Sequence, residues 1–403
     1  MIGVGVSEHI ETHAAATSAA REALSGLEER KPSLAIAVSA HKHNGDHVLE
    51  AIRSVVGDVP VFGGSAMGVI TRSTIGYLGN EVAVLALSEF VDPIHTITIR
   101  GLEEYGESVT GKKLGQQINR YLGDENVVIL FYDTVRTTVP PRHNVGSILL
   151  DAVYETLANP GVHLIGAGMS GDLELRTGYV FTGNAAEKGC VTAIVLPPYI
   201  SPSTSIMHAC VPVSSFMEIT RSEGSRIYEL DNQPALPVLL EKFGLSVDQA
   251  ENLILKTTLG QKYGDPFAPY DESAYVNQLI IDIDTQSGAI GLFEADLKIG
   301  ARIQLMARDN NLMIESVRQR TREILANQSS RNPFLAFYID CGGRTCLISG
   351  AEKEEARLLE QELPAKLPLF GFYSAVEIAP FYDRSRPLNW TGVLTLLADI
   401  SNE

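Results

Sequence analysis

Four polar residues near the carboxyl terminus lie in or beside glycine-rich turns, where a small molecule could bind. They are Arg344, Tyr373, Glu377 and Asn389. An arginine can hold a carboxylate through two parallel hydrogen bonds, and a glutamate can hold an ammonium group, so this set could grip both ends of a zwitterion. The arginine and the glutamate could instead form an internal pair that holds the turns together. The sequence leaves both interpretations open.

Cys341 ends an apolar run in the same region and could act as a nucleophile. A reactive thiol needs a nearby base or cation that lowers its pKa. No base neighbours Cys341 in the sequence, and the H-E-x-x-H, G-x-S-x-G and G-x-x-x-x-G-K-[ST] motifs do not occur. We therefore expect no enzyme. A hydrolase or transferase that uses Cys341 and Glu377 is kept as the alternative.

One isolated histidine and one group of three histidines could bind metal or a cofactor. His208 lies among apolar residues in the stretch 206–212, so it is either a buried core histidine or an axial ligand to an apolar cofactor such as haem. His41, His43 and His47 follow an apolar run, at the end of a strand where α/β proteins tend to bind ligands. These three also fit a solvated loop, and the sequence offers no complete ligand set for a metal.

Glycine turns follow two of the apolar runs. Gly63, Gly64 and Ser65 resemble a phosphate loop, but no lysine follows them. Residues 166–171 match G-x-G-x-x-G, but the residues after them do not read as a helix, which argues against a dinucleotide site. A missing Cβ serves either a tight turn or a close approach by another group. Gly63, Gly64 and Ser65 are kept as candidate ligand-binding residues.

These turns belong to a pattern that occurs three times. Each copy has an apolar run, then a short run ending in a glycine turn, then a closing apolar run. The apolar runs are Leu34–Ala40, Val127–Asp133 and Leu335–Cys341; the glycine runs start at Val61, Leu164 and Leu369; the closing runs are Val82–Leu87, Val191–Leu196 and Val393–Leu397. Helical spacing between them predicts strand-helix-strand-strand units whose glycine turns face a common hollow.

The fold class predicted from this pattern is α/β, of the mixed α+β kind, with layered sheets and helices. Two domains are expected, 1–200 and 201–403, because the stretch 197–205 is rich in proline and serine. Two β-hairpins are expected in the second half, at 216–230 and 279–293, and a helix at 311–326.

Composition excludes several classes of protein. The chain has 403 residues, 45% of them hydrophobic, and a formal net charge of −17. It has no Lys/Arg-rich run, so nucleic-acid binding is not expected. Four cysteines in a chain of this length do not make a disulfide scaffold. Because no basic and apolar leader and no long apolar span is seen, we expect a cytoplasmic protein that does not cross a membrane.

Several of these stretches resemble the FIST family of two-domain sensory proteins. Residues 341–344, 371–374, 377–380 and 389–391 resemble the signature of the FIST C-terminal domain, although Val376 stands where a small residue is usual. Residues 60–65 resemble the FIST N-terminal domain, and residues 208–212 and 229–236 resemble the middle of the family pattern.

The resemblance implies a sensory, ligand-binding protein of bacterial signal transduction. Stand-alone bacterial FIST proteins of this size are similar to nitric-oxide-sensing haem proteins that act on a histidine kinase or a cyclic-di-GMP enzyme, and others are thought to bind amino-acid-like metabolites. The resemblance thus implies haem or a small metabolite as ligand, with His208 as the first choice of haem ligand. It implies a signalling enzyme as partner and leaves a homodimer open. A scaffold that only presents surfaces to partner proteins is a further alternative.

Overall fold

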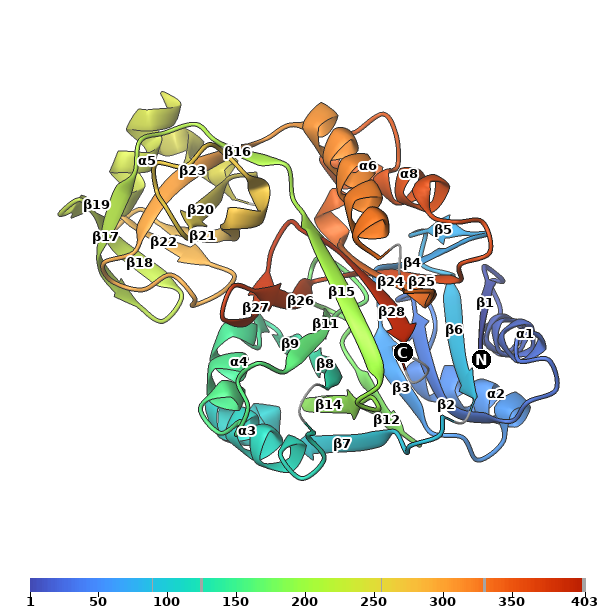
Figure 1. The fold of residues 1–403 in the computed structure, drawn as a ribbon. Helices are drawn as coiled ribbons and strands as arrows, with labels where there is room; N and C mark the ends of the chain where they lie inside the picture. Colours follow the sequence, from blue (N-terminus) through green and yellow to red (C-terminus); the bar gives the residue numbers. More distant parts are fainter. Residues whose placement is uncertain (89, 124–125, 255, 329–330, 401–403) are drawn as a thin grey trace.

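The structure is a computed structural model with side chains. It describes residues 1–88, 90–123, 126–254, 256–328 and 331–400. Within these residues the fold is mixed α/β, as predicted, and consists of three six-stranded sheets, one larger sheet and a two-stranded ribbon (Figure 1). The predicted threefold repeat is confirmed, because each six-stranded sheet is built on one copy of the pattern.

The first unit alternates strands and helices and ends in a hairpin and a closing strand. Its elements are β1 (Ile2–Ser7), α1 (Thr12–Ser25), β2 (Pro32–Ser39), α2 (Gly45–Val56), β3 (Val61–Ser65), β4 (Gly68–Thr71), β5 (Ile75–Gly76) and β6 (Val82–Ser88). The buried side of α1 is largely alanine, which lets this helix lie close to the sheet and to α2. Asn44 caps α2 by accepting a hydrogen bond from the His47 amide at 3.2 Å.

The second unit repeats this order and adds a small ribbon, β9–β10. Its elements are β7 (His95–Arg100), α3 (Leu102–Ile118), β8 (Val127–Asp133), β9 (Val135–Thr138), β10 (Pro141–His143), α4 (Gly146–Tyr154), β11 (His163–Met169), β12 (Val180–Gly183), β13 (Ala186–Glu187) and β14 (Cys190–Val195).

The third unit is interrupted after its first strand. Its elements are β15 (Ile200–Met207), α6 (Asn310–Asn327), β24 (Pro333–Cys341), the 3-10 turn η3 (Gly342–Arg344), α7 (Cys346–Ser349), α8 (Glu355–Glu362), β25 (Leu369–Ser374), β26 (Val376–Phe381), β27 (Arg384–Leu388) and β28 (Gly392–Asp399). The serine- and proline-rich stretch that suggested a domain boundary is therefore largely strand β15. Strands from both sides of residue 200 share sheets, and the division into domains 1–200 and 201–403 stays a prediction.

The interruption is a separate small barrel, residues 208–309. Its elements are β16 (Cys210–Pro212), β17 (Met217–Glu223), β18 (Arg226–Leu230), β19 (Gln233–Pro234), α5 (Ala235–Phe243), η1 (Val247–Leu253), β20 (Thr258–Lys262), η2 (Glu272–Ala274), β21 (Tyr275–Asp284), β22 (Ala289–Leu292) and β23 (Arg302–Arg308). Because β20 pairs with both β21 and β23, six strands close on themselves around an apolar core of their own. Both predicted hairpins, β17–β18 and β21–β22, belong to this barrel.

Each unit lends its hairpin to the sheet of another unit. The hairpin β12–β13 of the second unit extends the first sheet, β26–β27 of the third extends the second, and β4–β5 of the first extends the third. The exchange runs in a closed cycle, so no unit completes its sheet alone. It also covers the edges of β3, β11 and β25, the three strands that carry the repeated glycine and that we call the glycine strands. Without the hairpins these edges would expose unpaired backbone groups.

The glycine at the same place in each repeat is explained by backbone packing. Gly63, Gly166 and Gly371 face the neighbouring parallel strand, and a Cβ on them would lie 2.1, 1.8 and 2.2 Å from a carbonyl oxygen of that strand. Gly63 also has φ of +105°, which disfavours other residues. The repeated glycine is therefore a requirement of the sheets.

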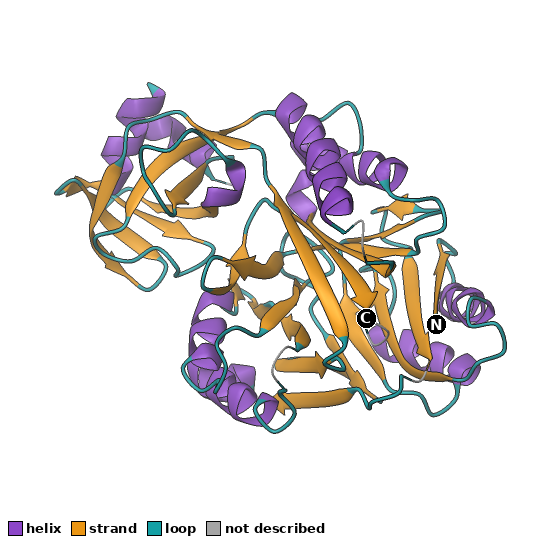
Figure 2. Ribbon diagram, viewed as in Figure 1, coloured by secondary structure: helices purple, strands orange, loops and turns teal. Residues whose placement is uncertain are grey.

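The three sheets meet in one central core. Their inward-facing side chains, such as Ile36, Phe131 and Phe337, form a single apolar cluster with members from every unit. The helices cover the outer faces, with α1 and α2 on the first sheet, α3 and α4 on the second, and α6 and α8 on the third (Figure 2). No helix among the described residues is long and apolar enough to cross a bilayer.

Candidate functional site

A small cavity lies where the three glycine strands end. It has a volume of about 70 Å³, and we call it the central cavity. Its walls come from all three units and from the barrel: Met67; Leu173 and Leu175; Cys341, Gly343, Ile348, Ser374, Ala375, Asn389 and Trp390; Leu279 and Phe293. Met67, Ala375 and the two leucines of the second unit each lie between a glycine strand and the hairpin that it leads into. The three repeats therefore converge on one hollow at the ends of β3, β11 and β25. The prediction of glycine turns was wrong, because Gly63, Gly166 and Gly371 lie within these strands and do not line the cavity.

The central cavity is mainly apolar and has an apolar mouth. Leu173 and Ile348 are 45% and 44% exposed, so large hydrophobic side chains face solvent at its rim. Leu175 has φ of +56°, a left-handed conformation that is uncommon for a leucine. Such strain persists only where the surroundings impose it, and it is found more often at binding sites than elsewhere. The segment that carries Leu173 and Leu175 is a constrained part of the wall, because the Asp172 carboxylate accepts hydrogen bonds from three amides of this segment.

The polar groups at the wall are engaged within the protein. The Asn389 Oδ1 accepts a hydrogen bond from the Leu279 amide at 3.2 Å, and its Nδ2 donates to the Leu388 carbonyl at 3.1 Å. Asn389 thus ties the barrel to the third unit while it lines the cavity. The Ser374 hydroxyl donates to Glu377 Oε1 at 2.8 Å.

Glu377 lies fully buried behind Ser374. Its second oxygen, Oε2, is near the main chain of Thr391 but makes no well-formed hydrogen bond to any described residue. Burial raises the pKa of Glu377 to about 8, against the lowering effect of the hydrogen bond from Ser374. At neutral pH the carboxyl is therefore mostly protonated, and it can donate a hydrogen bond as well as accept one.

Cys341 is the thiol at the wall of the central cavity. Burial, together with the nearby Glu377, raises the pKa of Cys341 well above its usual range. Both groups are thus uncharged at neutral pH. This arrangement does not activate a nucleophile, because the thiolate is the reactive species.

Arg344 lies outside the cavity, in a buried ionic cluster. Its guanidinium donates to both oxygens of Glu355 at 2.5 Å and approaches Asp340 at 3.2 Å, and all three side chains are fully buried. Its remaining nitrogen donates to the carbonyls of His208 and Trp390. The geometry therefore supports the internal-pair interpretation of Arg344, with Glu355 and Asp340 as partners in place of Glu377.

Comparison with known protein families finds matches over most of the chain. Residues 33–233 match the FIST N domain, and residues 235–380 match the FIST C domain. The chain belongs to the FIST family. FIST domains are associated with the sensing of small ligands in signal transduction. The junction between the two matches lies inside the barrel, while the glycine strands of both halves contribute to the central cavity.

Mycobacterial proteins resemble the whole chain. An uncharacterized protein of Mycobacterium tuberculosis is 25% identical over 401 residues, which cover 99% of this chain and 100% of that protein. An uncharacterized protein of Mycobacterium bovis is 24% identical over 402 residues, 99% of each chain. In both cases the similarity therefore extends over the stretches that form the barrel and the three units.

Tyr373 points away from the central cavity of this FIST protein. Its hydroxyl donates to Glu354 Oε1 at 2.7 Å, on the loop that precedes α8. Gly63, Gly64 and Ser65 lie inside the first sheet, where the Ser65 hydroxyl accepts from the Tyr179 amide at 3.2 Å. None of these four residues lines the cavity, and of the predicted ligand-binding residues only Asn389 does.

The surroundings of His208 do not fit a haem ligand. The ring is buried, its Nε2 donates to the Glu272 carbonyl at 2.8 Å, and its Nδ1 accepts from the Cys210 amide at 2.9 Å. Burial keeps the pKa of His208 below its usual value, which agrees with a neutral ring. Neither nitrogen can bind iron unless one of these hydrogen bonds breaks, so we assign no haem chemistry to this residue.

In the other histidine group only His43 is buried, while His41 and His47 are exposed, as the solvated-loop interpretation expects. The ring nitrogens of His43 meet the Thr12 hydroxyl at 3.0 Å and the Asn80 carbonyl at 2.8 Å. Among the described residues, no group of three or more histidine, cysteine, aspartate or glutamate side chains is placed to hold a metal ion.

Asp340 and Glu355 are the important buried residues that the sequence analysis missed. Asp340 lies inside an otherwise apolar strand, and a buried charge needs a partner, so its position is a signal that the sequence does contain. Met67, Leu173 and Leu175 were also missed as cavity residues. Their types are ordinary, and only the meeting of the three units gives them a role.

Proposed function

We propose that this FIST protein is a sensor that binds a small, uncharged ligand in the central cavity and passes that event to a partner signalling protein. The observation that carries the proposal is the convergence of the three glycine-strand ends on one cavity. A ligand there would touch every unit and the barrel at once. Because the units exchange hairpins, a change at their meeting point can alter how they pack against one another.

The size and polarity of the cavity favour a compact, mainly apolar ligand. An engineered apolar cavity of about 150 Å³ binds benzene, so a cavity of about 70 Å³ admits only a few non-hydrogen atoms. A larger ligand requires the segment with Leu173 and Leu175 to move outward. The wall carries no charged side chain among the described residues, which favours a neutral guest.

The ligands implied by the family resemblance fit this cavity less well. An amino acid needs partners for its two charges, and Arg344 is engaged with Glu355. Haem exceeds the volume of the cavity, and both ring nitrogens of His208 are occupied. Haem, nitric oxide and amino-acid-like ligands therefore stay in the proposal only as compounds to be tested.

The partner is proposed to be a histidine kinase or a cyclic-di-GMP enzyme, and it would read a change at the mouth of the cavity. Leu347 and Ile348 on α7 are 74% and 44% exposed, and Ile348 also lines the cavity. A ligand that displaces Ile348 would move an exposed apolar surface. Surfaces of this kind are typical of sites of protein interaction.

An enzyme that uses Cys341 and Glu377 is the second candidate. Glu377 is near enough to raise the pKa of Cys341, and Cys341 faces the cavity. The direction of this shift disfavours a thiolate nucleophile, so we rank this function below sensing.

A ligand screen with a filled-cavity variant tests the proposal. We would measure the thermal unfolding of the wild type with short alcohols, aldehydes and amides and with amino acids. A ligand at about 100 times its dissociation constant adds about 2.7 kcal/mol to stability. Ala375→Leu should abolish any shift, because the larger side chain fills the cavity, while Ala268→Leu on the exposed loop of the barrel should keep it.

Three results would count against the proposal. One is a ligand that shifts the wild type and Ala375→Leu equally. Another is the absence of a shift with every compound, which would favour a scaffold. The third is a Soret band that survives desalting of the purified protein, because a haem protein would need a different site from the central cavity.

A further inference from the structure

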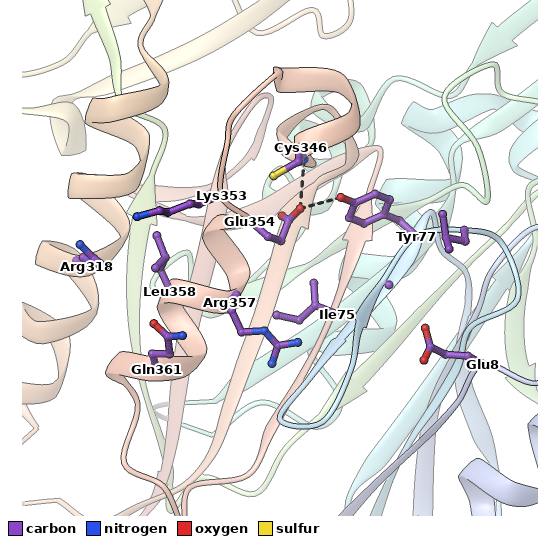
Figure 3. Close-up of a pocket in the computed structure, with 12 residues that line it drawn as sticks. Glu8, Ile75, Tyr77, Arg318, Cys346, Lys353, Glu354, Arg357, Leu358 and Gln361 are labelled. Atoms are coloured by element: carbon purple, nitrogen blue, oxygen red, sulfur yellow. Dashed lines mark hydrogen bonds between the residues drawn. The ribbon is translucent and has the colours of Figure 1, made fainter.

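A second, larger pocket lies on the opposite side of Tyr373 from the central cavity. It has a volume of about 640 Å³, within the range of about 300–1,000 Å³ typical of small-molecule sites. One wall is the hairpin β4–β5 that the first unit lends to the third. The other wall consists of α6, α8 and the loop before α8. We call this pocket the hairpin groove (Figure 3).

The two walls of the hairpin groove differ in character. The hairpin side presents Ile75, Tyr77 and Leu78, and Leu78 is 70% exposed. The helix side presents Arg318, Lys353 and Arg357 (Figure 3). Three cations on one wall are notable in a chain whose net charge is −17.

These cations keep hydrogen-bond donors for a ligand. Arg357 reaches Glu360 only at 3.6 Å, and Arg72 holds the same carboxylate at 3.1 Å. Lys353 makes no ion pair with any described residue. An arginine has five N–H donors, so a distant carboxylate leaves most of them free.

Arg318 is in the same position as Arg357. It reaches Glu362 only at 3.9 Å, while Arg322 binds that carboxylate at 2.7 Å. Each of the two arginines is thus the more distant partner of a glutamate that another arginine already holds.

The two carboxylates that line the groove, Glu8 and Glu354, offset only part of the charge of its three cations, so positive charge remains in excess. Glu354 accepts hydrogen bonds from the hydroxyls of Tyr373 at 2.7 Å and Tyr77 at 3.0 Å, and from the Cys346 amide at 3.2 Å. Both of its oxygens are occupied, so it forms part of the floor. Glu8 lies on the opposite wall, beside the hairpin, and would direct an anion toward the helix side (Figure 3).

We propose that the hairpin groove binds a small organic anion, with its carboxylate or phosphate against Arg357, which points toward the hairpin, and its apolar body against Ile75 and Leu78 (Figure 3). Lys353 points toward α6 and adds positive charge to the same wall. This site is separate from the central cavity and does not depend on the proposed sensing function. The two sites share short elements, however. Cys346 and Ile348, on the single turn of α7, line the groove and the cavity respectively.

Isothermal titration with matched probes tests this proposal. The probes are phenyl phosphate, 3-phenylpropionate and the uncharged 3-phenylpropanamide. The wild type should bind at least one of the two anions and should bind the amide at least tenfold more weakly. Affinity for the anion should fall as salt rises, because exposed charges are screened. Preference between the two anions distinguishes a phosphate ligand from a carboxylate ligand.

The variants separate a specific site from general attraction to positive charge. The double variant Lys353→Gln/Arg357→Gln should weaken anion binding at least tenfold. Arg302→Gln, at the exposed first residue of the barrel strand β23, changes the charge elsewhere and should leave affinity within twofold. The proposal is overturned if neither anion binds, if the amide binds as tightly as the anions, or if Arg302→Gln weakens binding as much as the double variant does. Circular dichroism of each variant checks its folding.

Discussion

Removing Arg344 should strongly destabilise this FIST protein. The guanidinium is fully buried and binds Glu355 and Asp340, and it also binds the main chain at His208 and Trp390. It therefore joins η3, α8, the entrance to the barrel and the start of β28. Breaking a buried ion pair by removing one partner costs about 3–5 kcal/mol, because it leaves an uncompensated buried charge. We expect a loss of this size for Arg344→Met.

The single tryptophan of the chain makes the assay local. Trp390 accepts a hydrogen bond from Arg344 through its carbonyl, so its fluorescence during urea unfolding reports on this region. Far-UV circular dichroism would follow the remainder of the molecule. Arg322→Met is the matched control, because it removes an ion pair at 2.7 Å whose arginine is 66% exposed. Exposed pairs contribute about 0–1 kcal/mol, so this control should change little.

A double variant tests the cause of the loss. Glu355→Gln removes the charge that Arg344→Met leaves unpaired, so the double variant should be more stable than Arg344→Met alone. A loss below about 1 kcal/mol for Arg344→Met would refute the reasoning and would favour Arg344 as a ligand-binding residue. A double variant less stable than Arg344→Met would refute the assigned partner.

Three further predictions concern protonation, backbone and thiol chemistry. The raised pKa of Glu377, about 8, means that the folded state binds a proton between the ordinary glutamate pKa and pH 8, so stability should fall by up to about 1.4 kcal/mol per pH unit as pH rises through this window. Glu377→Gln should flatten the dependence of the urea midpoint on pH, and an unchanged slope would refute the pKa shift. Gly63→Ala should destabilise the protein by about 2–4 kcal/mol in urea unfolding, since its Cβ would lie 2.1 Å from a carbonyl oxygen and φ is +105°. Gly123→Ala is the control and should stay within about 1 kcal/mol, because the nearest described atom, Asn126 Oδ1, lies 3.5 Å from the added Cβ. Equal effects would contradict the packing argument. Because burial and nearby carboxylates raise the pKa of Cys341 and Cys346, iodoacetamide at pH 7.4 should modify both thiols more slowly than free cysteine. Peptide mass spectrometry measures the rates, and modification of Cys341 faster than free cysteine would support the enzyme alternative instead.

The repeat could be predicted because its signal is local. Runs such as 34–38 are apolar throughout, which is typical of strands covered on both faces. The glycine at positions 63, 166 and 371 follows from close backbone approach, which no other residue allows. These two features recur in each unit, so the units could be aligned without any knowledge of their contacts.

The hairpin exchange could not be predicted in the same way. β5 and β13 are two residues long, too short for a hydrophobic pattern. β4 pairs with β25, about 300 positions later in the chain. Since short strands specify their partners weakly, the choice comes from the packing of the whole molecule and leaves no local trace.

The residues of the site could be predicted only in part, again because contacts between distant residues leave no local trace in the sequence. The sequence predicts Arg344 and Glu377 close together, because both lie in or beside glycine-rich turns that were expected to converge, yet the start of α8 places Glu355 on the guanidinium. Charges choose partners in space, and the sequence distance of eleven residues gave no indication of this contact. Asn389 does line the cavity, because it precedes the closing strand of the third unit, and its role in ligand binding stays a prediction.

A crystal of the protein under xenon pressure tests the central claim most directly. Apolar cavities in proteins stay dry and bind xenon, which requires no knowledge of the natural ligand. We predict xenon density in the central cavity between Met67, Ala375 and Trp390 in the wild type, and none there in Ala375→Leu. A cavity that holds no xenon in the wild type, or that is filled by side chains of its own wall, would contradict a ligand site at the meeting point of the three units.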